Sequence, residues 1–291
     1  MITGIITGFK EAKTIGKAII NMINSFMIAG VDYEIIVLAP DKETLDAARL
    51  YENNKIRVIQ DPGKGKPVSL NIAFKEAKGD ILILSDGDVY ICRFAIRELL
   101  KKMQDKNIGA VSGHPISLNS KDNIYGYWST LLTDMAHETR LNKMNFVVSG
   151  YLYAVRKSVL NFEVPKDCLS DDAYISYRII NQGYKILYAP SAQVMVKYPN
   201  NFKDWMKQKK RSTGGYTQIK DQYHLENQSR SFSQEAGGIF KVLRYASNIK
   251  ELFWTKLLIL ARVWLWLNIF WERKILNKSF EKTWTRIDST K

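Results

Sequence analysis

The chain contains very little cysteine, and its first residues do not have the pattern of a signal peptide. Its 291 residues include two cysteines, Cys92 and Cys168, and neither stands in a spacing that metal sites use. A framework of several disulfides is therefore excluded, and we expect a protein of a reducing, cytosolic compartment. Residues 1–7 lack the basic stretch and long apolar core of a signal peptide, and they predict a first β-strand instead.

Long apolar runs are also absent. The most apolar stretch, residues 257–271, has 15 residues and is interrupted by Arg262 and Asn268. A helix that spans a bilayer needs about 20 apolar residues, so this stretch is too short to span one. The sequence contains no internal repeat, and the polar stretch 200–234 is not of low complexity. We therefore expect an ordered globular protein without a membrane-spanning helix.

Acidic residues are outnumbered by basic ones. The 43 lysines and arginines stand against 29 aspartates and glutamates, which gives a net charge of +14. Such a surface favours an anionic partner, and nucleic acid, an anionic membrane and a phosphorylated substrate all fit. The excess continues in residues 230–291, which contain 12 basic and 5 acidic residues as well as five of the seven tryptophans.

The first two thirds of the chain alternate between strand-like and helix-like segments. The predicted strands are 2–7, 33–39, 56–60, 80–85, 108–112, 146–155 and 185–189. The predicted helices are 11–29, 43–51, 67–78, 120–143 and 171–182. This alternation indicates an α/β fold with a mostly parallel sheet flanked by helices on both faces.

Two carboxylates follow the apolar strand 80–85. Asp86 and Asp88 are separated by Gly87, and residues two apart in an extended segment point the same way. In an open α/β sheet the carboxyl ends of the strands are where ligands bind. Two hard oxygen ligands there suit Mg²⁺ or Mn²⁺ on a diphosphate. The alternative is a polar turn, since aspartate and glycine are common turn residues.

Three further groups of residues could contribute to a site. Residues 61–67 place glycines and lysines before a predicted helix, which suits phosphate, although a solvated loop fits as well. Asp171 and Asp172 begin another predicted helix, where acids also serve as caps. Residues 208–211 are rich in basic side chains and could by themselves be a solvated charge run.

Together these groups resemble glycosyltransferase family 2, whose members have the GT-A fold, over residues 2–220. The segments that resemble its motifs are, in chain order, 7–11, 33–41, 65–71, 85–88, 171–172 and the Gln-x-x-Arg motif at 208–211. The sequence departs from the family pattern at Pro40, which precedes Asp41 in place of a second aspartate. It departs again at Ser212, where membrane-associated members have tryptophan.

The resemblance implies a role for each matching residue. Asp172 is expected to be the catalytic base, and Arg211 a cation at the catalytic site. Asp86 and Asp88 are expected to bind the metal, Mg²⁺ or Mn²⁺. The expected donor-binding residues are Thr7, Glu11, Asp41, Lys66, Asp86 and Gln208. Gly150 and Asp171 are expected to bind the acceptor. The reaction would be an inverting transfer from a nucleotide-diphosphate sugar, with UDP-sugars favoured, to a lipid-linked or polysaccharide acceptor.

The resemblance also implies two regions, a glycosyltransferase domain over 1–225 and an amphipathic helical region over 226–291 that lies on a membrane surface. Tryptophans flanked by lysine and arginine are typical of interfacial helices. A helix packed on the protein's own core or in a homo-oligomer, and a shallowly inserted hairpin, are the alternatives. We expect a peripheral or monotopic protein on the cytoplasmic face of the cell membrane.

Other functions remain open at this point. A polyprenyl-phosphate sugar synthase that uses a GDP- or UDP-sugar fits the same residues. A nucleotidyltransferase would need a glycine-rich basic loop after the first strand, where residues 7–11 stand instead. A nucleic-acid binder is supported by the charge alone, because the sequence contains no recognition motif, and we expect no nucleic-acid partner.

Overall fold

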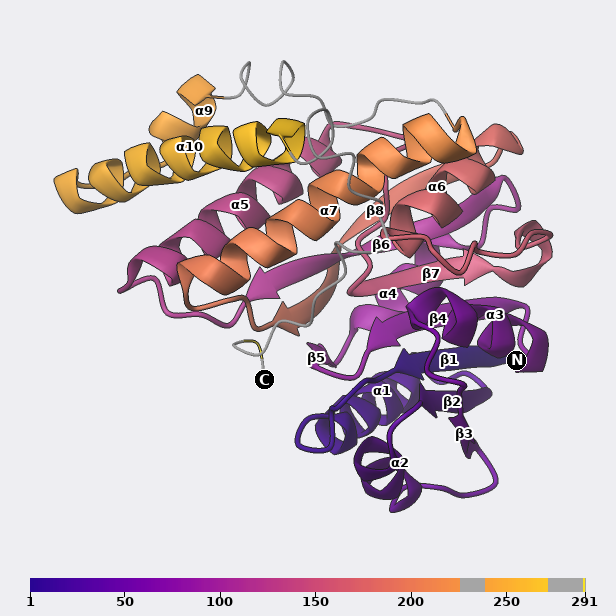
Figure 1. Ribbon diagram of the computed structural model, residues 1–291. Helices are drawn as coiled ribbons and strands as arrows, with labels where there is room; N and C mark the ends of the chain where they lie inside the picture. The colour runs from indigo at the N-terminus through magenta and orange to yellow at the C-terminus, as the bar shows by residue number, and fades with distance from the viewer. Residues whose placement is uncertain (226–238, 272–289, 291) are drawn as a thin grey trace.

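A single mixed sheet organises the molecule (Figure 1). The computed structural model describes residues 1–225, 239–271 and 290. In these residues the sheet has eight strands in the order β3-β2-β1-β4-β7-β6-β8-β5. The strands are β1 (Ile2–Thr7), β2 (Tyr33–Ala39), β3 (Ile56–Gln60), β4 (Ile81–Asp86), β5 (Val89–Ile91), β6 (Ile108–Ser117), β7 (Leu152–Arg156) and β8 (Lys185–Val196). The first four in spatial order are parallel, whereas β7 is antiparallel to both β4 and β6.

Helices cover both faces of this sheet. The helices are α1 (Ile15–Ala29), α2 (Lys42–Arg49), α3 (Lys66–Glu76), α4 (Ala95–Lys102), α5 (Ile124–Leu141), α6 (Asp171–Asn181), α7 (Phe202–Tyr223), α9 (Ile239–Leu243) and α10 (Ile249–Phe270). Alternate residues of a strand enter opposite cores: Ile6 packs with α1 and α4 on one face, and Ile5 packs with α3 and α6 on the other. The expected α/β fold with helices on both faces is therefore confirmed.

Most strands lie where the sequence predicts them, and β1, β2 and β3 agree to the residue. The predicted strand 146–155 is the main exception, because its first six residues leave the sheet. There the backbone N–H of Val148 donates to Ser176 Oγ at 3.0 Å, and that of Ser149 to Ser112 Oγ at 2.9 Å. Side-chain hydroxyls have replaced the strand ladder, so this segment bends toward the ends of the neighbouring strands.

The sequence patterns missed β5, α4, α7 and the short 3₁₀-helix Lys157–Val159. Helix α7 is the largest of them, with 22 residues inside the polar stretch 200–234. Its buried apolar positions are few, and Trp205, Tyr216 and Ile219 are the main ones. A helix so largely polar shows little apolar periodicity, which is why its sequence did not predict it.

Helices α5, α7 and α10 pack together beyond the sheet (Figure 1). Their shared apolar cluster consists of Tyr127, Trp128, Leu131, Trp205, Leu258 and Ala261. The hydroxyl of Tyr127 and Thr255 Oγ1 lie 2.7 Å apart, and Trp128 Nε1 donates to the carbonyl of Trp254 at 2.7 Å. These contacts fix α10 against the part of the protein that contains the sheet.

Helix α10 is longer than the 15-residue apolar run in the sequence. Its N-cap is Asn248, whose side chain accepts from the N–H of Glu251 at 2.9 Å, so the helix includes 22 residues from Ile249 onward. Among the described residues it alone is long and apolar enough to cross a membrane by length and composition. The expectation that this region is too short to span is thus wrong on length. The rest of 226–291 lies outside the described residues.

Candidate active site

A large cavity lies at the carboxyl ends of β1 and β4, with α7 over it. Its volume is about 1340 Å³. The predicted site residues that line it are Thr7, Glu11, Lys66, Asp86, Asp88, Gly150, Asp171, Asp172, Gln208 and Arg211. These residues come from six separate stretches of the chain, and the fold brings all of them to one place.

Asp86 and Asp88 lie at the floor of the cavity. Asp86 is the last residue of β4, and Thr7 Oγ1 at the end of β1 donates to its Oδ1 at 3.3 Å. The following N–H, of Gly87, donates to the carbonyl of Thr7 at 2.9 Å, which fixes the turn against β1. Burial, and then the negative charge of Asp86, raise the pKa of Asp88 to about 6. The two carboxylates are thus held together at a cost in electrostatic free energy.

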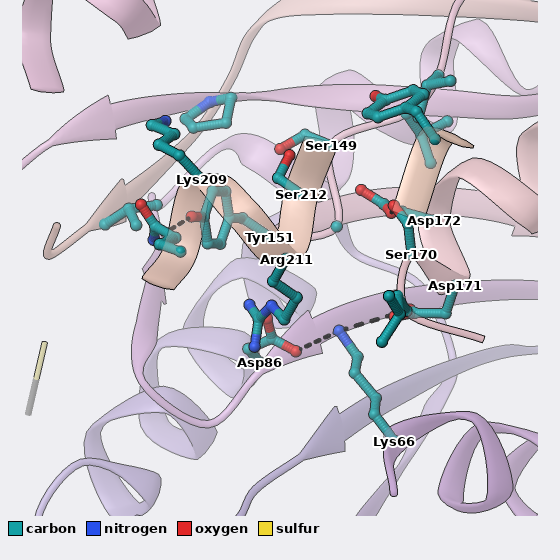
Figure 2. A pocket seen from close by; sticks show the side chains of 18 of the residues that line it. Lys66, Asp86, Ser149, Tyr151, Ser170, Asp171, Asp172, Lys209, Arg211 and Ser212 are labelled. Atoms are coloured by element: carbon teal, nitrogen blue, oxygen red, sulfur yellow. Dashed lines mark hydrogen bonds and ion pairs between the residues drawn. The ribbon is translucent and has the colours of Figure 1, made fainter. Parts of the chain in front are cut away.

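Lys66 joins two sides of the cavity. At the start of α3, its Nζ lies 2.7 Å from Asp86 Oδ1 and 3.6 Å from Asp171 Oδ2. Dashed lines mark these ion pairs in Figure 2. Burial by itself lowers the pKa of Lys66, but the charges of Asp171 and Asp86 outweigh burial and raise it above its ordinary value. The lysine is therefore a fixed cation between a carboxylate from β4 and one from α6.

Asp172 has one carboxylate oxygen engaged and one beside open space. Ser170 Oγ donates to Asp172 Oδ1 at 2.7 Å, and the N–H of Ala173 donates to the same oxygen at 2.9 Å. The other oxygen, Oδ2, lies opposite Gly150, where an added Cβ would stand 3.1 Å from it. Glycine at position 150 thus keeps clear the space next to Oδ2.

Helix α7 contributes an amide and a cation to the cavity. Gln208 Nε2 lies 3.5 Å from the hydroxyl of Tyr151, while its Oε1 is buried without a hydrogen-bond partner among the described residues. Arg211 is close enough to lower the pKa of Asp88 in opposition to burial. Figure 2 shows Lys209, Arg211 and Ser212 on this helix, with the side chain of Arg211 extending to Asp86. A ligand hydroxyl could supply the donor that Gln208 Oε1 lacks.

Helix α7 is held close to the loop before α6. At Gly215 an added Cβ would lie 2.6 Å from Ser170 Cβ, so only glycine permits this approach. Gln218 Oε1 accepts from the N–H of Leu169 at 2.9 Å. These contacts place Gln208 and Arg211 over the same cavity as Asp172.

Asp41 has a structural position that the sequence did not predict. Its Oδ1 accepts from the N–H and the hydroxyl of Thr44 at the start of α2, and its Oδ2 accepts from the N–H of Lys10. Pro40 lines the cavity, whereas Asp41 is absent from the lining. The expected role of Asp41 in binding the donor stays a prediction.

Comparison with known proteins identifies the family. A family model described as glycosyltransferase like family 2 matches residues 2–215. The chain belongs to glycosyltransferase family 2. The expected family and the expected enzyme class, a glycosyltransferase, are therefore confirmed.

Curated relatives of this family 2 glycosyltransferase include polysaccharide synthases. A probable glycosyltransferase, YdaM of Bacillus subtilis, is 28% identical over 175 residues, which cover 57% of this chain and 42% of that protein. The poly-beta-1,6-N-acetyl-D-glucosamine synthase of Staphylococcus aureus is 26% identical over 230 residues, or 74% of this chain and 54% of the synthase. The hyaluronan synthase of Streptococcus pyogenes is 26% identical over 207 residues, which cover 61% of this chain and 48% of that synthase. The chain spans about half the length of these relatives.

Solved structures confirm the fold of this glycosyltransferase. A mannosyltransferase from Pyrobaculum calidifontis in complex with GDP-Man and Mn²⁺ has a TM-score of 0.63 and 16% identity, covering 96% of this chain and 88% of that one. The mannosyl-3-phosphoglycerate synthase of Rubrobacter xylanophilus has a TM-score of 0.54 and 12% identity, and the match covers 78% of this chain and 76% of that one. At these identities the likeness establishes the GT-A fold.

The carboxylates of this glycosyltransferase fit a hard divalent cation. The described residues contain no cluster of three or more His, Cys, Asp or Glu side chains placed to hold a metal. Mg²⁺ is usually bound through one or two carboxylates together with substrate phosphates and water, and Asp86 with Asp88 would supply the two. A cation between them would relieve the repulsion that contributes to the raised pKa of Asp88.

Sequence reasoning missed one side of the cavity in this glycosyltransferase. Helix α5 contributes Ala136 and Arg140 to the lining, and α10 contributes Arg262 and Trp266. The two residues of each pair are four positions apart, so each pair lies on one face of its helix. Helical spacing could have identified each face, but not that the two faces meet at the cavity.

Proposed function

We propose that this glycosyltransferase transfers a sugar, with inversion, from a nucleotide-diphosphate sugar to a lipid-linked or polysaccharide acceptor at a membrane surface, with Mg²⁺ or Mn²⁺. A UDP-sugar is the favoured donor. The supporting observation is that one cavity contains Asp86, Asp88 and Asp172. Lys66 lies in the same cavity between Asp86 and Asp171, the neighbour of Asp172. Paired carboxylates for a metal and a separate carboxylate for a proton are the groups that such a transfer needs.

The donor would lie over the end of β4. Asp86 and Asp88 would hold the cation on the diphosphate. The bound cation would neutralise the charge that develops on the leaving group. Arg211 on α7 is a second cation for the diphosphate, since its planar guanidinium suits phosphate oxygens. Thr7, Glu11 and Gln208 line the same cavity and would contact the donor.

The acceptor hydroxyl would lie beside Asp172. Its oxygen attacks the anomeric carbon, its proton passes to Asp172 Oδ2, and the bond from the anomeric carbon to the diphosphate oxygen breaks. The nucleoside diphosphate leaves with that bonding pair. Gly150 leaves room for the hydroxyl, and Ser170 holds the carboxylate through its other oxygen.

The size of the cavity supports two substrates at once. At about 1340 Å³ it exceeds the roughly 300–1,000 Å³ of an ordinary small-molecule site. The relatives named as polysaccharide synthases support a polysaccharide acceptor. A polyprenyl-phosphate sugar synthase with a GDP- or UDP-sugar is the alternative.

A membrane location is supported by the outer face of α10. The side chains exposed on it are mostly large and apolar, namely Leu252, Phe253, Leu260, Val263, Trp264, Leu267 and Phe270. Two polar side chains of this helix lie on its inner side, where Thr255 is buried and Arg262 lines the cavity. Lys256 is exposed beside the apolar face. An apolar outer face with exposed tryptophan fits a helix that lies in or on the cytoplasmic surface of a membrane.

Thermal unfolding with nucleotides tests the donor site. UDP, GDP, CDP and dTDP are compared, each with Mn²⁺ and then with EDTA. At about 100 times its dissociation constant one nucleotide should raise the midpoint by roughly 2–4 °C, and only with metal. The Asp88→Asn variant should lose this metal-dependent shift, while the Asp122→Asn variant, changed at an exposed position, should keep it. Cooperative unfolding with no shift for any nucleotide would contradict the proposed function.

A further inference from the structure

One carboxylate oxygen of the active site is buried without a hydrogen-bond donor. Asp171 Oδ2 accepts no hydrogen bond from any residue that the structure describes, although the side chain of Asp171 is only 14% exposed. A buried acceptor without a donor costs free energy, and the cost is larger when the acceptor is charged. A donor should therefore reach this oxygen at some stage of the enzyme's cycle.

The ammonium of Lys66 is close enough to be that donor after a small movement. It lies 3.6 Å from Asp171 Oδ2, an ion-pair distance that is too long for a hydrogen bond. On its other side it lies 2.7 Å from Asp86 Oδ1 (Figure 2). A charge-assisted hydrogen bond has a length of about 2.8 Å, so a shift of about 1 Å toward α6 would form one.

The backbone holds Lys66 between the two carboxylates while its side chain can turn. Lys66 is the first residue of α3 and stands between Gly65, whose φ is 99°, and Pro67. Glycine adopts that dihedral without strain, and proline suits the first turn of a helix. The Cα of Lys66 is thus fixed, whereas its flexible four-carbon stem allows the ammonium to choose between two partners.

A divalent cation at the end of β4 would disfavour the first of these partners. Asp86 Oδ1 accepts from Thr7 Oγ1 at 3.3 Å as well as pairing with Lys66. A metal on this carboxylate would compete with the ammonium for the same oxygens, and its double charge would repel the lysine. Asp171 lies on the other side of Lys66 and would still attract it. With metal bound, Asp171 is the better partner.

We propose that Lys66 is a positioning residue that changes partner: when a divalent cation binds the carboxylates at the end of β4, its ammonium leaves Asp86 and hydrogen-bonds Asp171 Oδ2. This rests on the proposed function and assigns a further role within the same site. Asp171 begins α6 and is the neighbour of Asp172, the proposed base. The exchange draws Lys66 and the start of α6 together, so binding of the metal is felt on the acceptor side.

Binding of Mn²⁺ to the full chain tests the exchange without turnover. Free Mn²⁺ is measured by electron paramagnetic resonance in the absence of nucleotide. Lys66→Met should bind Mn²⁺ about tenfold more tightly than wild type, because the competing cation is gone. Lys75→Met removes an exposed lysine that pairs with Glu163, and it should leave the affinity for Mn²⁺ unchanged.

A double-mutant cycle separates the exchange from simple charge effects. Asp171→Asn should weaken Mn²⁺ binding about fivefold more when Lys66 is present than in Lys66→Met, because the displaced lysine then lacks its second partner. A lysine that stayed in place would pair with Asp171 equally with and without metal, and the two changes would be additive. Additive changes would overturn the inference, as would Mn²⁺ affinity in Lys66→Met no higher than in wild type.

Further measurements keep the outcomes distinct. Each variant is first checked for cooperative thermal unfolding, and Lys66→Gln replaces Lys66→Met in the cycle if Lys66→Met does not fold. An additive cycle in protein that keeps its metal-dependent nucleotide shift would overturn the exchange and leave the proposed function standing. Absence of Mn²⁺ binding to wild type, both alone and with each nucleotide of the thermal panel, would contradict the proposed function and the inference with it.

Discussion

The ammonium of Lys66 lies 2.7 Å from Asp86 Oδ1, so a cation stands beside the predicted metal-binding carboxylate before any ligand binds. The same nitrogen lies 3.6 Å from Asp171 Oδ2 on the opposite side of the cavity. The side chains of Lys66, Asp86 and Asp171 are each less than one third exposed. One lysine at the start of α3 therefore offsets charge from both the proposed donor and the proposed acceptor sides.

Replacing this lysine should destabilise the protein. Lys66→Met leaves Asp86 and Asp171 without their shared cation, which we expect to cost about 1–3 kcal/mol of unfolding free energy. Lys75→Met is the matched control, because Lys75 also lies 2.7 Å from its partner Glu163 but both side chains are about 70% exposed. That surface pair should contribute no more than about 1 kcal/mol. Equal losses for the two variants in chemical denaturation would contradict the role of Lys66.

Neutralising the proposed base should stop turnover without loss of donor binding. Asp172→Asn keeps an oxygen that can accept from Ser170 and Ala173 but has no proton affinity to offer the acceptor hydroxyl. We expect the rate to fall by about 10²–10⁴-fold. The metal-dependent nucleotide shift, measured on the same sample, should be unchanged. Normal turnover by Asp172→Asn would show that another group accepts the proton.

A methyl group at position 150 should block the acceptor. Gly150→Ala would place Cβ 3.1 Å from Asp172 Oδ2, in the space where the hydroxyl is expected. Turnover should drop at least tenfold while the nucleotide shift persists. Gly214→Ala serves as the control, since its Cβ would meet Leu169 at an ordinary 3.9 Å. Full activity in Gly150→Ala would place the acceptor elsewhere.

The stability of the fold should fall below neutral pH through a pair of stacked histidines. The rings of His114 and His137 lie 4.1 Å apart at an angle of 14°. Burial, followed by the charge of His137, lowers the pKa of His114 below its ordinary 6.5, with Arg140 acting in the same direction. Hydrogen bonding to the Pro190 carbonyl and the charge of Asp134 raise that pKa, but they do not outweigh the lowering.

Proton binding decides whether stability rises or falls with pH. Near pH 6 the unfolded chain binds a proton at this position more readily than the folded chain does, so unfolding free energy decreases as pH falls through 6.5. His114→Asn retains a donor for Pro190 and should flatten the dependence between about pH 7.5 and pH 5. His224→Asn, at an exposed position, should leave it unchanged. An identical slope in wild type and His114→Asn would exclude this pair as the cause.

A charge on the outer face of α10 should weaken membrane binding. Leu267→Glu places a carboxylate at a position that is 57% exposed, where we propose that the helix meets lipid. Burying one leucine contributes about 1.5–3 kcal/mol, so sedimentation with anionic vesicles should show at least a tenfold weaker partition. Leu50→Glu changes an exposed leucine at the C-terminal end of α2 and should partition like wild type. Equal behaviour of the two variants would argue for a different anchor.

The first strands and the carboxylates at their ends could be predicted because each depends on a short run of consecutive residues. Each of β1, β2 and β3 is a short, mostly apolar run, and the sequence predicts each to the residue. Asp86 and Asp88 follow such a run, so the side of the sheet at which they lie follows from strand direction alone. Helix α6 begins at Asp171, also as predicted.

Other features depend on contacts between distant segments. Residues 146–151 have the composition of a strand, yet hydroxyls from Ser112 and Ser176 hold that backbone away from the sheet. Helix α7 is polar, so what favours its position is the close approach of Gly215 to Ser170 and the burial of Trp205. Asp41 matches a family motif, but its three hydrogen bonds cap α2 and hold the loop at Lys10.

The sequence by itself determined the bounds of β1, β2 and β3, the family and the positions of the carboxylates along the chain, since periodicity and short motifs record local structure. Only the tertiary structure decided that Lys66 lies between Asp86 and Asp171 and that α10 turns its apolar face outward and Arg262 inward. Helical spacing shows that a helix has two faces, but which face is buried depends on what packs against it. Here the partner is α5, more than a hundred residues earlier in the chain.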